Sequence, residues 1–98
     1  MPKREPLNSE AIELALADLS EWTWENDCIK KRFQFSSFKE AISFIVRVSF
    51  EAESLDHHPE LLNVYNRVDV TLSTHDAGNR VTEMDIELAS AIEQFAWT

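Results

Sequence analysis

The sequence predicts an α+β fold, in which helices pack on one face of a mainly antiparallel sheet. Three segments repeat apolar residues at helical spacing, and each follows a residue that can cap a helix. Between them lie segments in which apolar and polar residues alternate, as in strands with one buried face. Helices and strands segregated in this way are typical of α+β proteins. The 98 residues, 1–98, fit one domain, since domains commonly have about 100–150 residues.

The N-terminal third of the chain predicts a helix followed by a β-hairpin. Residues 1–7 are expected to form a flexible tail. A helix is then expected over residues 10–19, capped by Ser9. Its apolar spacing comes from Ile12, Leu14, Ala15 and Leu19. Residues 21–35 alternate in polarity around the turn pair Asn26-Asp27, which predicts a hairpin.

A long helix is expected next, from about Phe38 to Leu55, with caps at Ser36-Ser37. We expect its core-facing stripe to be Phe38, Ala41, Ile42, Ile45 and Ala52. A second line of residues follows at i, i+4, i+7 and i+11, namely Val46, Phe50, Glu53 and His57. An apolar ridge should therefore end in a carboxylate and an imidazole on the same face. The apolar residues outside the core stripe, together with an unprotected edge strand, predict a homo-oligomer; they are Phe44, Val46, Val48 and Phe50.

The last third of the chain predicts one strand and one helix. Residues 63–75 resemble a strand in which Val68, Val70 and Leu72 point to one side, with a kink or bulge near Asn66-Arg67. After a loop that holds the only glycine, Thr82 caps a final helix and Asp85 completes a capping box. Its buried face is expected to be Leu88, Ala91, Ile92 and Phe95. Periodicity alone therefore gives the order α, β-hairpin, α, β, α.

Composition narrows the classes of function. The net charge of −9 argues against binding to nucleic acid or anionic membranes, because phosphate affinity comes largely from Lys and Arg. No stretch approaches a membrane span of about 20 apolar residues, and the N-terminus has no apolar run of the kind found in signal peptides. The single cysteine, Cys28, cannot form an internal disulfide and is expected to be a packed small residue. We therefore expect a soluble protein of the cytoplasm.

Two adjacent histidines, His57 and His58, mark the place where the long helix must stop. Pro59 pushes the residue before it out of the helical region, so the helix should end at or before His58. The last turn of a helix carries about half a unit of negative charge. Together with Glu53 and Asp56, this charge favours the imidazolium form of His57. A histidine poised near neutral pH is suited to general acid or base catalysis.

The third histidine, His75, is expected at the far end of a strand, where a sheet end and a helix end can meet at one cleft. Two other readings of the histidines remain open. Adjacent histidines can simply be a solvated helix terminus, and three histidines with an acid can bind zinc or iron. The metal hypothesis is disfavoured, because sequence neighbours project in different directions and no HExxH or paired-cysteine spacing is present.

Several of these residues together resemble the signature of a known family. The run Glu53-x-x-x-His57-His58-Pro59, followed by Tyr65, His75 and Asp85, resembles the pterin-4a-carbinolamine dehydratases. That family is also known as the dimerisation cofactor of a hepatocyte transcription factor. The resemblance extends over nearly the whole chain, with further matches at Trp22, in the FQF-x-x-F segment, in YNRVDVTLSTH and in DIELASAIEQ.

The resemblance implies a four-stranded antiparallel sheet backed by helices, in the order α-β-β-α-β-β-α. It implies the dehydration of 4a-hydroxytetrahydropterin to quinonoid dihydropterin in tetrahydrobiopterin recycling, without a metal or an organic cofactor. The implied catalytic residues are His57, His58 and His75, and the implied supporting acids are Glu53, Asp56 and Asp85. The implied partners are the pterin and further copies of the chain, in a homodimer or homotetramer.

Two alternatives to this enzyme stay open. One is a protein-binding module that stabilises a partner's dimer, and the other is a relative that acts in another pterin-linked pathway. The chain also departs from the family pattern at two places. Leu61 and Leu62 stand where many members have an aromatic that can flank the pterin, and Glu21 stands where members often have glycine.

Overall fold

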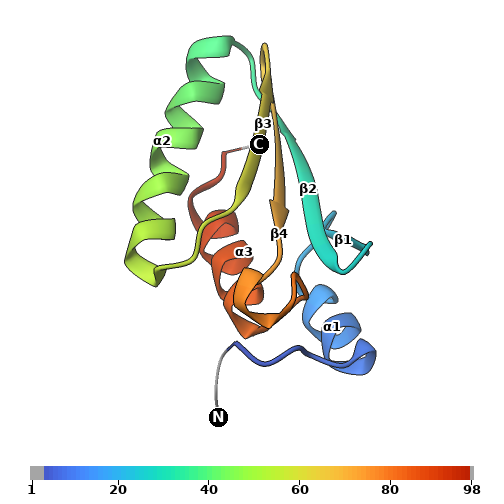
Figure 1. The fold of residues 1–98 in the computed structure, drawn as a ribbon. Coiled ribbons are helices and arrows are strands. Elements are labelled where there is room, and N and C mark those ends of the chain that lie inside the picture. The colour runs from blue at the N-terminus through green and yellow to red at the C-terminus, as the bar shows by residue number, and fades with distance from the viewer. Residues whose placement is uncertain (1–3, 98) are drawn as a thin grey trace.

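A computed structural model describes residues 4–97 and confirms the α+β fold in the order α-β-β-α-β-β-α (Figure 1). The sheet has four antiparallel strands in the order β1-β2-β4-β3. The elements in chain order are α1 (Ser9–Leu16), β1 (Thr23–Glu25), β2 (Cys28–Gln34), α2 (Phe38–Leu55), β3 (Glu60–Val64), β4 (Arg67–Leu72), the short 3₁₀ helix η1 (His75–Ala77) and α3 (Glu83–Phe95). None of the helices within residues 4–97 has the length and apolar character needed to cross a membrane.

Two tight hairpins build the sheet. Asn26 and Asp27 both have positive φ, of 52° and 61°, and join β1 to β2, as the sequence predicts. The second hairpin joins β3 to β4 through Tyr65 and Asn66, with Val64 opposite Arg67. The expected kink in one long strand was therefore wrong. Val64 and Tyr65 are apolar and the next two residues are polar, so the alternation breaks at this turn. The break alone does not distinguish a kink or bulge from a reversal of the chain.

Helix α2 has the predicted bounds but faces the sheet with a different stripe. The hydroxyl of Ser37 caps it by accepting from the Glu40 N–H at 3.2 Å. Its buried residues are Ala41, Phe44, Val48 and Ala52. The expected stripe was wrong in part, because Phe38 and Ile42 are exposed and Phe44 and Val48 lie in the core. The exposed apolar residues form another line at i+4 spacing, here called the outer stripe: Phe38, Ile42, Val46 and Phe50.

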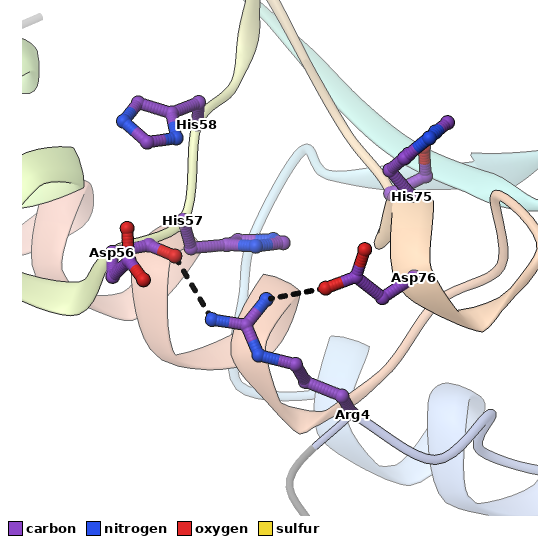
Figure 2. A pocket seen from close by; sticks show the side chains of 7 residues that line it. Arg4, Asp56, His57, His58, His75 and Asp76 are labelled. Carbon is purple, nitrogen blue, oxygen red and sulfur yellow. Dashed lines mark hydrogen bonds and ion pairs between the residues drawn. The ribbon is translucent and has the colours of Figure 1, made fainter.

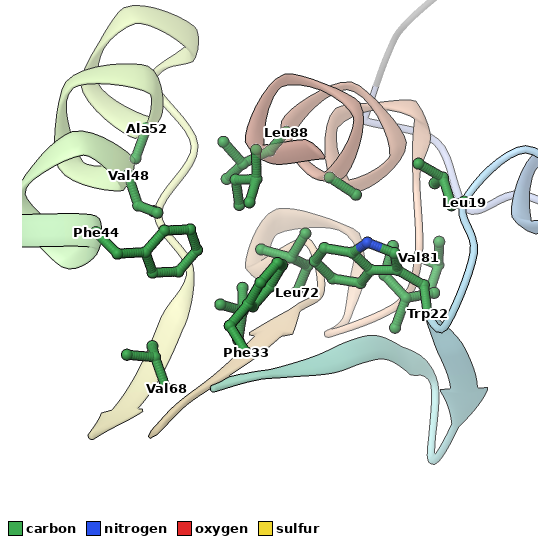
Figure 3. Packing of buried hydrophobic residues seen from close by; sticks show 14 of the residues in the cluster. Leu19, Trp22, Phe33, Phe44, Val48, Ala52, Val68, Leu72, Val81 and Leu88 are labelled. Carbon is green, nitrogen blue, oxygen red and sulfur yellow. The ribbon is translucent and has the colours of Figure 1, made fainter. Parts of the chain in front are cut away.

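The core lies between the sheet and helices α2 and α3 (Figure 3). Phe33 of β2 packs its ring 4.7 Å from that of Phe44 and 6.1 Å from that of Trp22, measured between centroids. Leu88 of α3 and Leu72 of β4 are fully buried in the same cluster. The other members of this cluster come from all three α-helices, from β2 and β4 and from the connecting segments. One continuous core therefore fixes the ends of β4 and α2, where the histidines lie.

The N-terminal segment differs from its prediction. Asn8, not Ser9, caps α1 by accepting from the Ala11 N–H at 2.8 Å, and the helix ends at Leu16. Leu14 is 76% exposed and does not belong to the buried face. In the described part of the expected tail, the Leu7 N–H donates to the Val81 carbonyl at 2.9 Å. Residues 1–3 lie outside the described part of the chain.

Candidate active site

The end of α2 turns His57 into the protein. Asp56 adopts the left-handed conformation, with φ of 51° and ψ of 46°. The Asp56 N–H donates to the Glu53 carbonyl at 3.2 Å, and the His57 N–H donates to the Ala52 carbonyl at 3.0 Å. This pair of bonds is a Schellman motif, which closes a helix and redirects the chain. Because the chain changes direction at Asp56, His57 does not continue the line of Val46, Phe50 and Glu53 that the helical spacing predicts.

His57 and Glu53 therefore do not share a face, which corrects the expectation from spacing. His57 is only 4% exposed, whereas Glu53 lies on the surface. The carboxylate of Glu53 instead lies 3.8 Å from Nε2 of His58, and both of these side chains are largely in solvent. An ion pair so exposed contributes little to stability.

The buried partner of His57 is Asp85, in the first turn of α3. Oδ1 of Asp85 lies 2.5 Å from Nε2 of His57, and the carboxylate accepts the ring N–H. Oδ2 of Asp85 accepts from the Thr82 N–H at 2.8 Å and from the Thr74 hydroxyl at 2.9 Å. The predicted capping box is confirmed. Asp85 is therefore both a helix cap and the residue that fixes the orientation of His57.

His75 begins the short helix η1, three residues after β4 ends at Leu72, whereas the sequence predicts it at the end of the strand. The chain leaves β4 and folds back through a bridge between Thr74 and Arg80. Gly78, with φ of 73°, closes η1, and its N–H donates to the His75 carbonyl. Nδ1 of His75 lies 3.3 Å from Oδ1 of Asn79, so the exposed ring is tethered only at one edge.

These segments enclose a cavity of about 390 Å³ around the histidines (Figure 2). It is lined by Arg4, Asp56, His57, His58, Ser73, His75 and Asp76. An adjoining hollow shares His58, Ser73 and His75 and adds Pro59, Glu60, Thr71 and Asn79. The three imidazoles thus meet at one pocket, although they come from two distant parts of the chain. The lining is mostly polar, with imidazoles, hydroxyls and carboxylates as the groups that can exchange protons.

Three lining residues were not predicted as site residues from the sequence, namely Arg4, Ser73 and Asp76. Arg4 donates to the Asp56 backbone carbonyl at 2.9 Å and pairs with Asp76 at 3.9 Å (Figure 2). Arg4 falls in the segment expected to be a flexible tail, and no local pattern marks a residue whose partners lie more than fifty positions away. Asp76 follows His75 directly, and that adjacency is the only signal that could have found it.

The predicted supporting acids have three different placements. Asp56 lines the pocket, and its carbonyl oxygen anchors Arg4. Asp85 lies behind His57, and Glu53 stands outside the pocket beside His58. Leu61 packs against the core and Leu62 is exposed, so neither lines the cavity that holds the three histidines.

Cys28 lies away from the histidines, near the β1–β2 turn, and its thiol donates to the Glu25 carbonyl at 3.2 Å. Burial raises the pKa of the Cys28 thiol above its usual value, which disfavours the nucleophilic thiolate. Among residues 4–97, no group of three or more His, Cys, Asp and Glu side chains is arranged to hold a metal ion.

Similarity to known proteins extends over nearly the whole chain. A model of the family described as pterin 4 alpha carbinolamine dehydratase matches residues 5–95. The chain belongs to the pterin-4a-carbinolamine dehydratase family. A relative from Opitutus terrae is 54% identical over 86 residues, which are 88% of this chain and 89% of the relative. A relative from Mesorhizobium japonicum is 49% identical over 94 residues, covering 94% of this chain and 95% of the relative. Both are provisionally named pterin-4-alpha-carbinolamine dehydratases.

Solved structures show the same fold. A crystal structure of a transcriptional coactivator/pterin dehydratase from Brucella melitensis has a TM-score of 0.87 at 40% identity, covering 92% of this chain and 97% of that one. A pterin dehydratase-like protein, described as a RuBisCO assembly factor in the alpha-carboxysome, has a TM-score of 0.62 at 20% identity, covering 79% and 88%. This second likeness concerns the fold alone.

Proposed function

We propose that this protein dehydrates 4a-hydroxytetrahydropterin to quinonoid dihydropterin in tetrahydrobiopterin recycling, with His57, His58 and His75 as the acid-base groups. The observation that carries the proposal is the meeting of three imidazoles at one pocket, with His57 held by the buried carboxylate of Asp85. Membership of the dehydratase family and the provisional names of its relatives support the same reaction.

The reaction requires two proton transfers, one to the hydroxyl on C4a and one from the neighbouring N5. The C4a–O bond breaks as the hydroxyl takes a proton from an acid and leaves as water. The N5=C4a double bond forms as a base removes the proton on N5. Imidazole can serve as either group near neutral pH, so a set of histidines suffices for both transfers. His58 and His75 stand exposed at opposite sides of the pocket, where they can reach a bound ring and exchange protons with solvent.

Asp85 acts through His57. Because the carboxylate accepts the N–H on Nε2, a neutral His57 ring carries its lone pair on Nδ1. No described residue bonds to that Nδ1 atom, so it stays available to a ligand in the pocket. A buried carboxylate that is already bonded to Thr74 and Thr82 cannot rotate away. The ring of His57 is therefore presented to the pocket in a fixed orientation.

The direct experiment is a dehydration assay on the purified protein. Freshly generated 4a-hydroxytetrahydropterin loses water spontaneously, and stopped-flow absorbance follows the formation of the quinonoid product. We expect the protein to accelerate this step in proportion to its concentration. A rate equal to the uncatalysed rate at every protein concentration would refute the proposed activity.

The second candidate function is binding to another protein. The outer stripe of α2 leaves four apolar side chains in solvent, and the solved Brucella relative is described as a transcriptional coactivator as well as a pterin dehydratase. We propose that this stripe mediates self-association into a homodimer or homotetramer, and the same surface is available to a different protein partner. Such binding does not exclude catalysis, because the outer stripe and the histidine pocket share no residue.

A further inference from the structure

Arg4 brings a permanent positive charge to the histidine pocket. Among residues 4–97 that line this cavity, Arg4 is the one Lys or Arg. One guanidinium nitrogen donates to the Asp56 carbonyl at 2.9 Å, and the other terminal nitrogen pairs with Asp76 at 3.9 Å. Among the described residues, these two contacts leave most of the N–H donors of the guanidinium without a partner. The group is thus held in place and still able to donate to a ligand.

The N-terminal arm that carries this guanidinium is attached to the core at Leu7. The Leu7 N–H donates to the Val81 carbonyl, and the Leu7 side chain packs against the core. Arg4 therefore joins the end of α2, which carries His57 and His58, to η1, which carries His75 (Figure 2). Because Arg4 contacts both of these segments, it lies within reach of any ligand that touches His58 and His75 together.

The chemistry of the pocket restricts what Arg4 can bind. The carboxylates of Asp56 and Asp76 also line the cavity, and the whole chain has a net charge of −9. An anionic ligand is disfavoured by this surrounding charge, whereas a neutral carbonyl oxygen is not. Within residues 4–97, no aromatic side chain other than the imidazoles lines the cavity, so hydrogen bonds are the main means of orienting a flat ring there.

We propose that Arg4 is a substrate-binding residue that donates hydrogen bonds to the 4-oxo edge of the pterin and so orients the ring toward the histidines. The proposal rests on the proposed function and names a contact within that same pocket. A planar guanidinium holds its N–H donors in one plane, so it can direct them at the lone pairs of a carbonyl oxygen in the plane of a flat ring, whereas a lysine ammonium is a point charge. The N-terminal arm is thereby part of the binding site and not only a connection to it.

The test compares two probes that differ at the atom in question. The first probe is pterin, which carries a 4-oxo group, and the second is 2,4-diaminopteridine, in which an amine replaces that oxygen. Fluorescence titration of the full chain gives a dissociation constant for each. The unaltered protein should prefer pterin, and Arg4→Ala should weaken pterin binding about tenfold, as expected for a lost hydrogen bond to a charged donor. Binding of 2,4-diaminopteridine should change less than about twofold, because that probe has no acceptor at this position.

Arg4→Lys is the matched variant, because it keeps the charge and loses the planar fork; it should recover only part of the preference for pterin. In steady-state dehydration, Arg4→Ala should raise KM about tenfold and leave kcat within about threefold. If Arg4→Ala weakens both probes by the same factor, Arg4 is only a structural strap and the proposal is overturned. If the unaltered protein catalyses dehydration but does not prefer pterin, the contact is also overturned while the proposed function stands. If the unaltered protein neither binds pterin nor catalyses dehydration, both the proposed function and the Arg4 contact are overturned.

Discussion

Nε2 of His57 lies 2.5 Å from Oδ1 of Asp85, and both side chains are buried. This contact joins the C-terminal end of α2 to the first turn of α3. A single carboxylate thus serves three donors, namely the ring of His57, the backbone of Thr82 and the hydroxyl of Thr74. If His57 acts in the reaction as proposed, stability and catalysis depend on the same carboxylate, and substitutions of Asp85 should affect both.

Replacing Asp85 with Asn should lower both the stability of the protein and its dehydration rate. If Asp85 were only a helix cap, the effect would be smaller, because Asn also caps helices. An amide has one acceptor oxygen, so its NH₂ must face either the Thr82 N–H or the ring N–H of His57. We expect a loss of about 1–3 kcal/mol in the free energy of unfolding. The dehydration rate should fall about 10²-fold, which is the lower end of the effect of removing a general acid or base. Urea melts and steady-state rates measure the two effects.

Ser37→Ala is the control for the Asp85→Asn variant. It removes the cap of α2 at the end opposite the histidines and should cost about 1 kcal/mol in stability without altering the rate. If Asp85→Asn loses stability but keeps its full rate, then Asp85 is a cap alone and does not act through His57.

Glu21→Gly should stabilise the protein. Glu21 has a φ of 70°, a conformation that glycine adopts readily and that costs other residues about 1–2 kcal/mol. Since the unfolded state of the glycine variant is also more flexible, we expect a net gain of about 1 kcal/mol in urea unfolding. As a control, Glu13→Gly in the exposed face of α1 should destabilise by about 1 kcal/mol. A loss of stability in Glu21→Gly would contradict this assignment of strain.

Phe50→Glu should disrupt self-association. Phe50 is 66% exposed and ends the outer stripe, so a carboxylate there opposes burial of that line against a second copy. We expect light scattering at micromolar concentration to return an oligomer for the unaltered protein and a lower mass for the variant. Leu14→Glu, on the exposed side of α1, should leave the mass unchanged. A monomer mass for the unaltered protein would reject the oligomer.

Removal of divalent metals should leave activity unchanged. Proton transfer by imidazoles is sufficient to lose water from a carbinolamine, so no Lewis acid is required. Dialysis against a strong chelator, followed by assay in chelator-containing buffer, checks this prediction. A loss of rate that zinc or iron restores would show that the histidines serve a metal and not the pterin directly.

The bounds of α2 could be predicted because their signals are local. Ser37 caps the start, and the proline at position 59 forbids continuation past the histidines. Its buried face could not be predicted, since two apolar lines at i+4 spacing run along the helix. Phe44 and Val48 on one line, and Ile42 and Val46 on the other, satisfy the same periodicity. Only packing against the sheet decides between them.

Most residues of the candidate site could be predicted from the sequence, but the contacts between them could not. The adjacency of His57 and His58 marks a helix end, and the capping box marks Asp85. The bond between His57 and Asp85 joins residues 28 positions apart, and no periodicity relates them. The left-handed turn at Asp56 reverses the side on which His57 emerges, which is why helical spacing wrongly assigned Glu53 as its neighbour.

The most direct test of the account is the dehydration rate of His58→Ala and His75→Ala, measured beside the melting curve of each variant. Both side chains are exposed and make only surface contacts, so neither substitution should alter folding noticeably. We predict a fall in rate of about 10²–10⁴-fold for a lost acid or base, with an unchanged melting temperature. Rates near that of the unaltered protein in both variants would contradict catalysis by the histidine pocket and would favour the protein-binding function instead.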